Sequence, residues 1–542
     1  MAAKKFRPYD PQARVELPGD LRRYLPLDHP VFLLEDLVES LDLSPITSVY
    51  ELGDGRGQPP YDPVLLTKLL LHAYCEGETS SRVIMRKTYE DIGYRVLCVD
   101  QHPDFRTISD FRERHLAAFR VLFTDTVRLA KELGQVRLEH VAQDGSKILA
   151  NASKHKAMSY ERLAQTEARL GQEIAEILEQ ARATDTAEDA RYGRDRSGDE
   201  GPEALAREVA FRQARQARIR AAKAALEARA AAEAAAAADP DPAQRQPPQV
   251  LEPEPPPAAA AEVVLTSPPS LALVPDEPAA AEAEEDQASA PPAVVPGPRA
   301  QYNFTDPQSR IMPSKDGFVQ AYNGQVAVDN YRQIIVACDV TDDCTDPRQL
   351  QPVLDQVRQH TGDLPEEYSA DTGFWSEENI AALEARGIDA YIPPPRPPRR
   401  KDGTVSDTPL SPAKVRMQEK LATPAGKRTY SLRKETAEPV FGQLKDGRGL
   451  RRFRTRGLAK VRGEWALWCL THNLRKLMGV VRAQQSAAHG PLEQPIGTPS
   501  RLYCALALLH RASQVLMQRL RKTSARSYDP FAYLSLLTQT RS

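Results

Sequence analysis

The sequence predicts a mixed α/β protein in which a sheet-containing core follows a helical domain and is interrupted by a long insertion. Three observations support this prediction. Residues 1–134 contain runs with apolar side chains at the spacing of amphipathic helices. Residues 135–153 and 301–392 contain alternating or β-branched runs, which are typical of strands. Residues 154–300, which lie between them, show only helical or low-complexity patterns.

The N-terminal segment carries start signals for two of its expected helices. "YDP" places Asp62 and Pro63 before one helix, and Ser80 or Ser81 can cap the next. A bundle of short helices is therefore expected.

The core is expected to begin in "VRLEHVAQDGSKIL", as two strand-like stretches around a turn at Asp144 and Gly145. "GFVQAYNGQVAVDN" and "YRQIIVACDVTD" are expected to form neighbouring strands, and "DPRQLQPVLDQVRQHTG" an amphipathic helix. Asp371 then follows the strand of "EEYSADTGFWS", and Gly387 separates a helix from a strand in "EENIAALEARGIDAYIP". This order fits a mixed sheet flanked by helices.

The insertion divides into two parts. Two helical runs, which can pair as a hairpin, precede an Ala/Pro/Glu-rich stretch that lacks core-forming residues and is interpreted as a disordered linker. The predicted segments are the helical N-terminal domain (1–134), the first part of the core (135–153), the helical insertion (154–238), the linker (239–300), the rest of the core (301–480) and a helical tail (481–542).

Composition limits the class of protein. The formal net charge is −2, but residues 445–462 carry eight Lys or Arg and one Asp. This local asymmetry says more about partners than the total charge does. The six cysteines form no CxxC pair, which fits a reducing cytoplasm and offers no zinc site. We find neither a signal peptide nor an apolar run long enough for a membrane span, so a cytoplasmic protein is expected.

Three acids stand out by their positions. Asp144 is expected at the end of the first core strand, Asp371 just after a later strand, and Glu438 early on a helix, immediately before the basic run. Strand ends in an open sheet meet along one edge, so these carboxylates can converge. Converging carboxylates suit Mg²⁺ or Mn²⁺, and two such ions about 3.5–4 Å apart support phosphoryl displacement. The basic run would then hold a phosphate backbone.

Each feature also has an ordinary structural explanation. An Asp-Gly pair is usually a turn, "ADTG" is also a helix-start signal, and an isolated Glu on a helix is usually solvated. The basic run is more often a surface of ion pairs than a nucleic-acid site, and Trp465 and Trp468 are expected to pack in the core. The residues taken singly leave these alternatives open.

Several motifs, taken together and in order, resemble the DDE transposases of bacterial insertion sequences. They are "AQDGSKILANAS", "YNGQVAVDN", "SADTGFWSEENIAALEARGIDAYI" and "AEPVFGQLKDGRGLRRFRTRGLAKVRGEWALWCLTHNLRKL". The subgroup is the one with a Tyr–Arg–Glu–Lys signature around its last acid. "YDPVLLTKLLLHAYCEG" and the segment that follows it also resemble the helical, DNA-binding domain of such enzymes.

This resemblance implies an RNase H-like core interrupted after its first strand. Asp144, Asp371 and Glu438 would be the catalytic triad and would bind two Mg²⁺ or Mn²⁺ ions. The enzyme would cut double-stranded DNA at the element ends and transfer a 3′-hydroxyl to target DNA, as a homodimer on DNA. The implied DNA-binding residues are Tyr430, Arg433, Lys445, Arg448, Arg451, Arg452, Arg454 and Arg456.

The signature departs from the family in one place. It usually leaves three residues between its Arg and Glu, whereas Arg433 and Glu438 have four between them. Lys434 restores that gap but breaks the spacing to Tyr430. Three alternatives to a transposase are a metal-dependent nuclease without joining activity, an inactive transposase-derived DNA-binding protein, and a coiled-coil structural protein suggested by residues 157–238.

Overall fold

The computed structural model describes residues 19–26, 28–51, 60–192, 202–238, 295–314, 317–396 and 410–488. Contacts divide the chain into two compact units. One contains Met1–Lys154 and Thr305–Ser542, and the other is His155–Phe304. Most of the linker predicted at 239–300 and most of the tail predicted at 481–542 lie outside the described residues. No helix of the described residues has the length and apolar character needed to cross a membrane.

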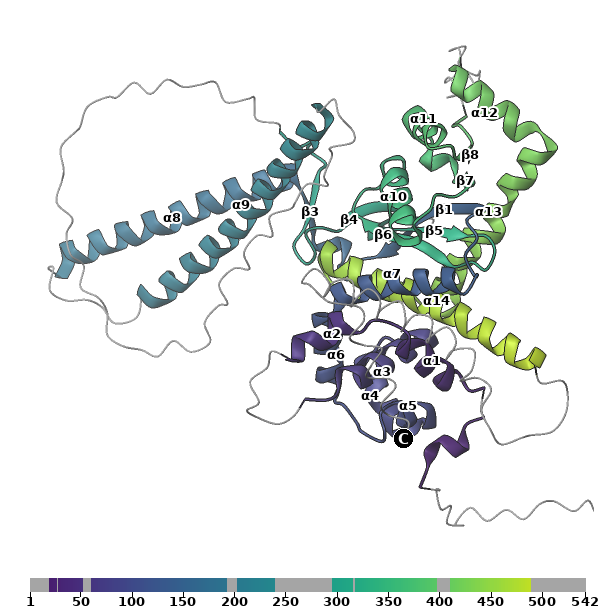
Figure 1. The fold of residues 1–542 in the computed structure, drawn as a ribbon. Helices are drawn as coiled ribbons and strands as arrows, with labels where there is room; N and C mark the ends of the chain where they lie inside the picture. Colours follow the sequence, from purple (N-terminus) through teal and green to yellow (C-terminus); the bar gives the residue numbers. More distant parts are fainter. Residues whose placement is uncertain are drawn as a thin grey trace, which may run out of the picture. The chain divides into compact units, whose positions relative to one another are not determined.

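The first unit begins with the predicted bundle of short helices (Figure 1). Asp62 caps α3 by accepting a hydrogen bond from the amide of Val64 at 2.7 Å, and Pro63 is the first residue of that helix, as predicted. Ser80 precedes α4, but its side chain makes no capping hydrogen bond. The elements are the short 3-10 helix η1 (Leu21–Tyr24), α1 (Pro30–Glu39), α2 (Ser44–Glu51), α3 (Pro63–Glu76), α4 (Ser81–Glu90), α5 (Ile92–Leu97), α6 (Phe105–Arg114) and α7 (Leu116–Glu132).

The core of this unit is a mixed six-stranded sheet, which confirms the predicted α/β class. β1 lies between β5, to which it is antiparallel, and β7, to which it is parallel; β8 continues the parallel side. β4 and β6 both pair antiparallel with β5. The strands are β1 (His140–Leu149), β4 (Arg310–Ser314), β5 (Gly317–Asp329), β6 (Ile335–Thr341), β7 (Glu367–Ser369) and β8 (Asp389–Tyr391).

The turn predicted at Asp144 and Gly145 is wrong, because β1 runs through both residues and pairs with β5 on either side of them. A Cβ atom at position 145 would lie 2.5 Å from Nε2 of Gln325 and 2.9 Å from Oδ1 of Asp346. The glycine therefore allows two polar side chains to approach the strand, and it does not form a turn. Asp144 consequently lies in the middle of its strand and not at the end.

Helices of the core pack against this sheet. α14 packs against α7 and β6, whereas α13 packs against β1 and β5 (Figure 1). Trp465 and Trp468 on α14 are buried, as predicted. The helices are α10 (Leu350–Thr361), α11 (Glu377–Ala385), α12 (Pro412–Ala422), α13 (Pro424–Gly442), the π-helical turn η6 (Gln443–Gly447) and α14 (Leu458–Ala488).

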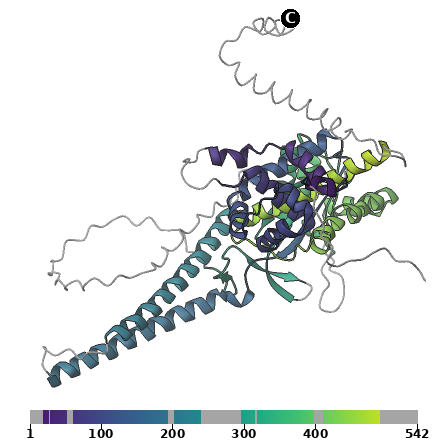
Figure 2. The same cartoon turned by 90° about the horizontal axis from the view of Figure 1, so that it is seen from below.

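The second unit is the predicted helical hairpin. α8 (Tyr160–Tyr192) and α9 (Pro202–Ala238) lie side by side, and β2 (Ala157–Ser159) pairs antiparallel with β3 (Gln301–Asn303) at their base (Figure 2). The apolar contact between the helices is formed by Leu163, Leu170, Ile219, Ala222 and Leu226. The hairpin therefore has a small hydrophobic core of its own.

Candidate active site

Side chains of β1 alternate between the two faces of the sheet. Asp144 and Ser146 face α13 and η6, where Arg433 and Lys445 contact them. Gln143 lies on the opposite face and donates a hydrogen bond to the carbonyl of Gln349, just before α10. Although Asp144 is not at a strand end, the strand thus presents it directly to helix α13.

Arg433 joins two of the three predicted carboxylates. Its Nη1 atom lies 3.5 Å from Oδ1 of Asp144, and its Nη2 atom donates a hydrogen bond of 2.8 Å to Oε1 of Glu438. Asp144 and Arg433 are largely buried, whereas the Glu438 side chain is 44 % exposed. Helix α13 therefore brings a guanidinium group and a carboxylate to the middle of β1.

Asp371 follows β7 and accepts a hydrogen bond of 2.8 Å from the amide of Gly373, which caps the short 3-10 helix Thr372–Phe374. It acts electrostatically on Asp144. Burial, with smaller contributions from the negative charges of Asp371 and Glu438, raises the pKa of Asp144 to about 6, while the positive charge of Arg433 opposes the change. Asp371 and Glu438 are therefore both near enough to Asp144 to affect its pKa.

Among the described residues, no three His, Cys, Asp or Glu side chains lie close enough together to hold a metal ion. The carboxylates of Asp144 and Glu438 instead share the Arg433 guanidinium. Their chemistry still suits a divalent ion, because hard oxygen ligands prefer Mg²⁺ or Mn²⁺. Asp371 adds a third negative charge that acts on Asp144, and Lys445 adds a second positive charge.

Helix α13 contains a proline one residue after Glu438. Pro439 has no amide hydrogen to donate to the carbonyl of Glu435, the acceptor one turn earlier. The side chain of Gln333, which lies between β5 and β6, supplies that hydrogen bond at 2.7 Å. Oε1 of Gln333 also accepts from Gln443 and from Lys476. Gln333 therefore connects the helical turn that carries Glu438 to α14.

The other signature residues surround this arrangement. The ring centroid of Tyr430 lies 6.0 Å from the guanidinium carbon of Arg433, and burial raises the pKa of Tyr430. Lys445 donates hydrogen bonds to Oγ of Ser146 and, at 2.9 Å, to the carbonyl of Lys147. Lys434 is exposed. Arg433, and not Lys434, is therefore the basic residue of this turn that contacts the carboxylates.

The prediction that Arg448 contacts DNA does not fit its position. Arg448 is buried, and its guanidinium donates hydrogen bonds to the carbonyls of Tyr74 and Trp468 and to Oγ1 of Thr471. Burial lowers the pKa of Arg448 to about 10. This arginine joins the N-terminal bundle to α14, and the spacing of basic residues in the sequence could not distinguish it from its exposed neighbours.

The other four arginines of the basic run that were predicted to bind DNA are exposed. Arg451 pairs with Asp446, and Arg452 donates to the carbonyl of Ala150 at 3.1 Å. The remaining two are Arg454 and Arg456. These side chains reach solvent and are compatible with a phosphate contact.

A fourth carboxylate, which the sequence motifs did not indicate, lies near the site. Oδ1 of Asp346 accepts hydrogen bonds from Asn323 at 2.6 Å and from Gln325 at 2.8 Å. Its Oδ2 would lie 3.3 Å from a Cβ atom at Gly373, beside Asp371. Asp346 lies just before the helical turn that leads into α10. An acid shortly after a predicted strand was the available signal, since the same signal selected Asp371.

Two family models match the chain. One, described as "Transposase DDE domain", matches residues 397–478, and the other, "Transposase domain (DUF772)", matches residues 19–114. The matches support a bacterial insertion-sequence transposase. They indicate a transposase function, and the first one covers Tyr430, Arg433 and Glu438. No curated protein and no solved structure matches the chain.

Proposed function

We propose that the protein is a DNA transposase that cuts DNA at the ends of its element and transfers the liberated 3′-hydroxyl to target DNA. Asp144, Asp371 and Glu438 are the proposed catalytic residues, on an RNase H-like core. The observation that supports the proposal best is the contact of Arg433 with both Asp144 and Glu438. Asp371 also acts electrostatically on Asp144.

The donor set suits the divalent ions that DDE transposase domains generally use. In the proposed active form, Asp144, Asp371 and Glu438 would hold two Mg²⁺ or Mn²⁺ ions. Such ions supply a nucleophile at neutral pH and stabilise charge on the leaving oxygen. Arg433 now neutralises part of the negative charge of these carboxylates. Its guanidinium must release at least one of them when a cation takes its place.

The basic side chains around the carboxylates would hold the DNA. Lys445 lies on η6 near Asp144, and the arginines at 451, 452, 454 and 456 are exposed on the following segment. Tyr430 and Arg433 would contact DNA close to the cut phosphodiester. Positive side chains bind the phosphate backbone whatever its sequence, so specificity is left to other contacts, which we assign to the N-terminal domain.

Strand transfer tests the proposal. Purified full-length protein with Mg²⁺ should nick and join DNA that carries the inverted repeats flanking its own reading frame. Asp144→Asn, Asp371→Asn and Glu438→Gln should each abolish both steps. Glu435→Gln changes an exposed glutamate one helical turn before Glu438 and should retain activity, so it serves as the matched control. Full activity in the three variants would contradict the assignment of the triad.

Other outcomes identify the alternatives. Hydrolysis without joined products, and without dependence on the repeats, would indicate a nuclease. Salt-sensitive DNA binding that survives loss of all three acids, with no cleavage by the wild type, would indicate an inactive descendant. Transposition holds two ends together, so the proposal also expects a homodimer on DNA, measurable by light scattering of the complex.

A further inference from the structure

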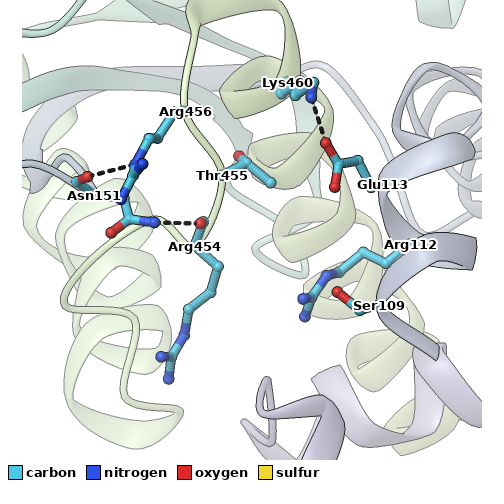
Figure 3. Close-up of a pocket in the computed structure, with 8 residues that line it drawn as sticks. All are labelled: Ser109, Arg112, Glu113, Asn151, Arg454, Thr455, Arg456 and Lys460. Carbon is cyan, nitrogen blue, oxygen red and sulfur yellow. Dashed lines mark hydrogen bonds and ion pairs between the residues drawn. The ribbon is translucent and has the colours of Figure 1, made fainter. Parts of the chain in front are cut away.

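A basic pocket lies outside the carboxylate site. It has a volume of about 340 Å³. It is formed by α6 of the N-terminal bundle, the residues just after β1, the loop before α14, and the first turn of α14 (Figure 3). Four basic residues and one acid line it, together with three uncharged polar residues. The lining residues are Ser109, Arg112, Glu113, Asn151, Arg454, Thr455, Arg456 and Lys460.

Among the residues that the structure describes, three of the four basic side chains have no carboxylate at ion-pair distance. Lys460 pairs with Glu113. Arg112 donates to the carbonyl of Thr79 at 2.7 Å, and Arg454 donates to Oγ1 of the same threonine at 3.3 Å. Within the described part of the chain, neither arginine has a carboxylate at ion-pair distance. The two guanidinium groups are thus brought close to one another by a shared neutral partner, an arrangement that an anion would stabilise.

Arg456 lies on the same loop as Arg454. Nε of Arg456 donates to the carbonyl of Asn151 at 3.0 Å (Figure 3). Asp306 acts on Arg456 electrostatically, but no carboxylate of the described residues lies at ion-pair distance from it. Its remaining guanidinium hydrogens are therefore able to bind an anion.

The loop that carries these arginines is held in place by a buried acid. The carboxylate of Glu464 on α14 is fully buried and accepts hydrogen bonds from the amides of Arg454 and Thr455 and from Oγ1 of Thr455. This carboxylate is satisfied by neutral donors of the loop backbone and does not neutralise the arginine side chains. The pocket is preorganised, which lowers the entropic cost of binding.

We propose that this pocket binds a phosphate group of the DNA backbone, so that Arg112 on the N-terminal domain and Arg454 and Arg456 on the core grip the same strand. Taking DNA as the source of the phosphate rests on the proposed function. Guanidinium groups bind phosphate oxygens through charge-assisted and often bidentate hydrogen bonds. The pocket would fix the N-terminal domain and the core on one DNA segment. The sequence-specific DNA contacts of the N-terminal domain would then be aligned with the carboxylates of the core.

DNA affinity over a range of salt concentrations tests the proposal. The probe is a short duplex with the flanking inverted repeat, and EDTA is present so that cleavage does not contribute. Arg454→Gln and Arg456→Gln should each weaken binding about tenfold, the cost of losing one charge-assisted hydrogen bond. Each should also lower the slope of log affinity against log salt by about one. Arg358→Gln removes an exposed arginine of α10 and should leave both values unchanged.

Arg112 requires a second variant, because its hydrogen bond to the carbonyl of Thr79 also supports the fold. Arg112→Gln should weaken binding like the other two, whereas Arg112→Lys should retain the salt slope. Unchanged affinity and slope in Arg454→Gln and Arg456→Gln overturns the proposal. It is also overturned if inorganic phosphate raises the melting temperature of the wild type but not of Arg454→Gln while DNA binding is equal in both, because the ligand is then free phosphate.

Failure of this inference and failure of the proposed function are distinguishable. If the wild type performs strand transfer and the pocket variants bind DNA as well as it does, only the pocket assignment fails. If the wild type shows no transfer but the pocket variants lose DNA affinity and salt dependence, the pocket assignment stands and the transposase activity does not.

Discussion

The amide nitrogen of the Gln333 side chain donates a hydrogen bond of 2.7 Å to the backbone carbonyl of Glu435. In a regular helix that carbonyl would accept from the residue four positions later, which is Pro439 and has no N–H. Gln333 itself has a positive φ of 56°, which glutamine seldom adopts. A side chain from the connection between β5 and β6 thus completes the helical turn that carries Glu438.

We predict that Gln333→Glu destabilises the protein by about 1–3 kcal/mol, because it replaces the donor by an oxygen facing a carbonyl. The free energy of unfolding in urea measures this. The cost should be smaller in a Pro439→Ala background, where residue 439 can donate to Glu435 itself. Gln359→Glu changes an exposed glutamine on α10 and is the control. An equal cost in both backgrounds would contradict the proposed role of Gln333.

The unfavourable environment of the Asp144 charge leads to a second prediction. Burial and the neighbouring acids raise the pKa of Asp144 to about 6, so at pH 7 its ionised form costs folding free energy. Asp144→Asn should therefore stabilise the metal-free protein, by about 1–3 kcal/mol, while abolishing activity. Thermal unfolding in EDTA measures the change, and Asp110→Asn on the exposed face of α6 is the control.

Addition of Mg²⁺ should make the wild type more stable than Asp144→Asn, the reverse of their order in EDTA. A ligand that binds only the native state raises its apparent stability, so Mg²⁺ should raise the melting temperature of the wild type and not that of Asp144→Asn. A lower melting temperature for Asp144→Asn than for the wild type in EDTA would show that the aspartate charge stabilises the fold and is not held at a cost for function.

The position of Arg433 between Asp144 and Glu438 gives a third prediction. A guanidinium and a divalent ion compete for the same carboxylates, so Arg433→Gln should bind Mn²⁺ more tightly than the wild type. Strand transfer should nevertheless fall, because the proposed DNA contact is lost. Titration calorimetry with Mn²⁺ measures the first effect, with Lys434→Gln as the control on the exposed neighbour. Weaker Mn²⁺ binding would mean that Arg433 positions the carboxylates for the ion.

The local patterns of the chain predicted the elements of the fold well. The alternation of β5 and β6, the helix α10, and the cap at Asp62 are all encoded within a few neighbouring residues. Gly145 was misread because the reason for a glycine there is distant in sequence. The groups that approach it are Gln325 and Asp346, and only the pairing of β1 with β5 brings them together.

At the candidate site, too, local sequence patterns did not show contacts between residues that are far apart in the chain. The motifs pointed to Asp144, Asp371 and Glu438, but they did not show that Arg433 lies between two of them or that Asp346 lies nearby. A run of arginines likewise says nothing about which one is buried. The guanidinium of Arg448 donates hydrogen bonds to backbone carbonyls of α3 and α14. Contacts between residues so far apart in the chain do not appear in the local pattern of the sequence.

The last prediction concerns acid stability. His472 on α14 is buried, and its Nε2 atom lies 2.9 Å from the carbonyl oxygen of Gln333, which makes it the donor. Burial, together with the positive charges of Arg448, Lys476 and Arg475, lowers the pKa of His472 to about 3 from an ordinary value of 6.5. Between these pH values the unfolded chain binds a proton that the folded protein does not. Stability contributed by His472 is therefore present above the ordinary value and is lost as the pH falls toward the folded value.

His472→Gln should flatten the pH dependence of the unfolding free energy in this range, by up to about 1.4 kcal/mol per pH unit for one proton. Urea unfolding at several pH values between these limits measures the slope, and subtraction of the wild-type curve removes the contributions of Asp144 and the other buried histidines. His155→Gln, at an exposed position, should leave the curve parallel to that of the wild type. An unchanged slope in His472→Gln would mean that His472 is accommodated in its charged form, with its neighbours rearranged around it.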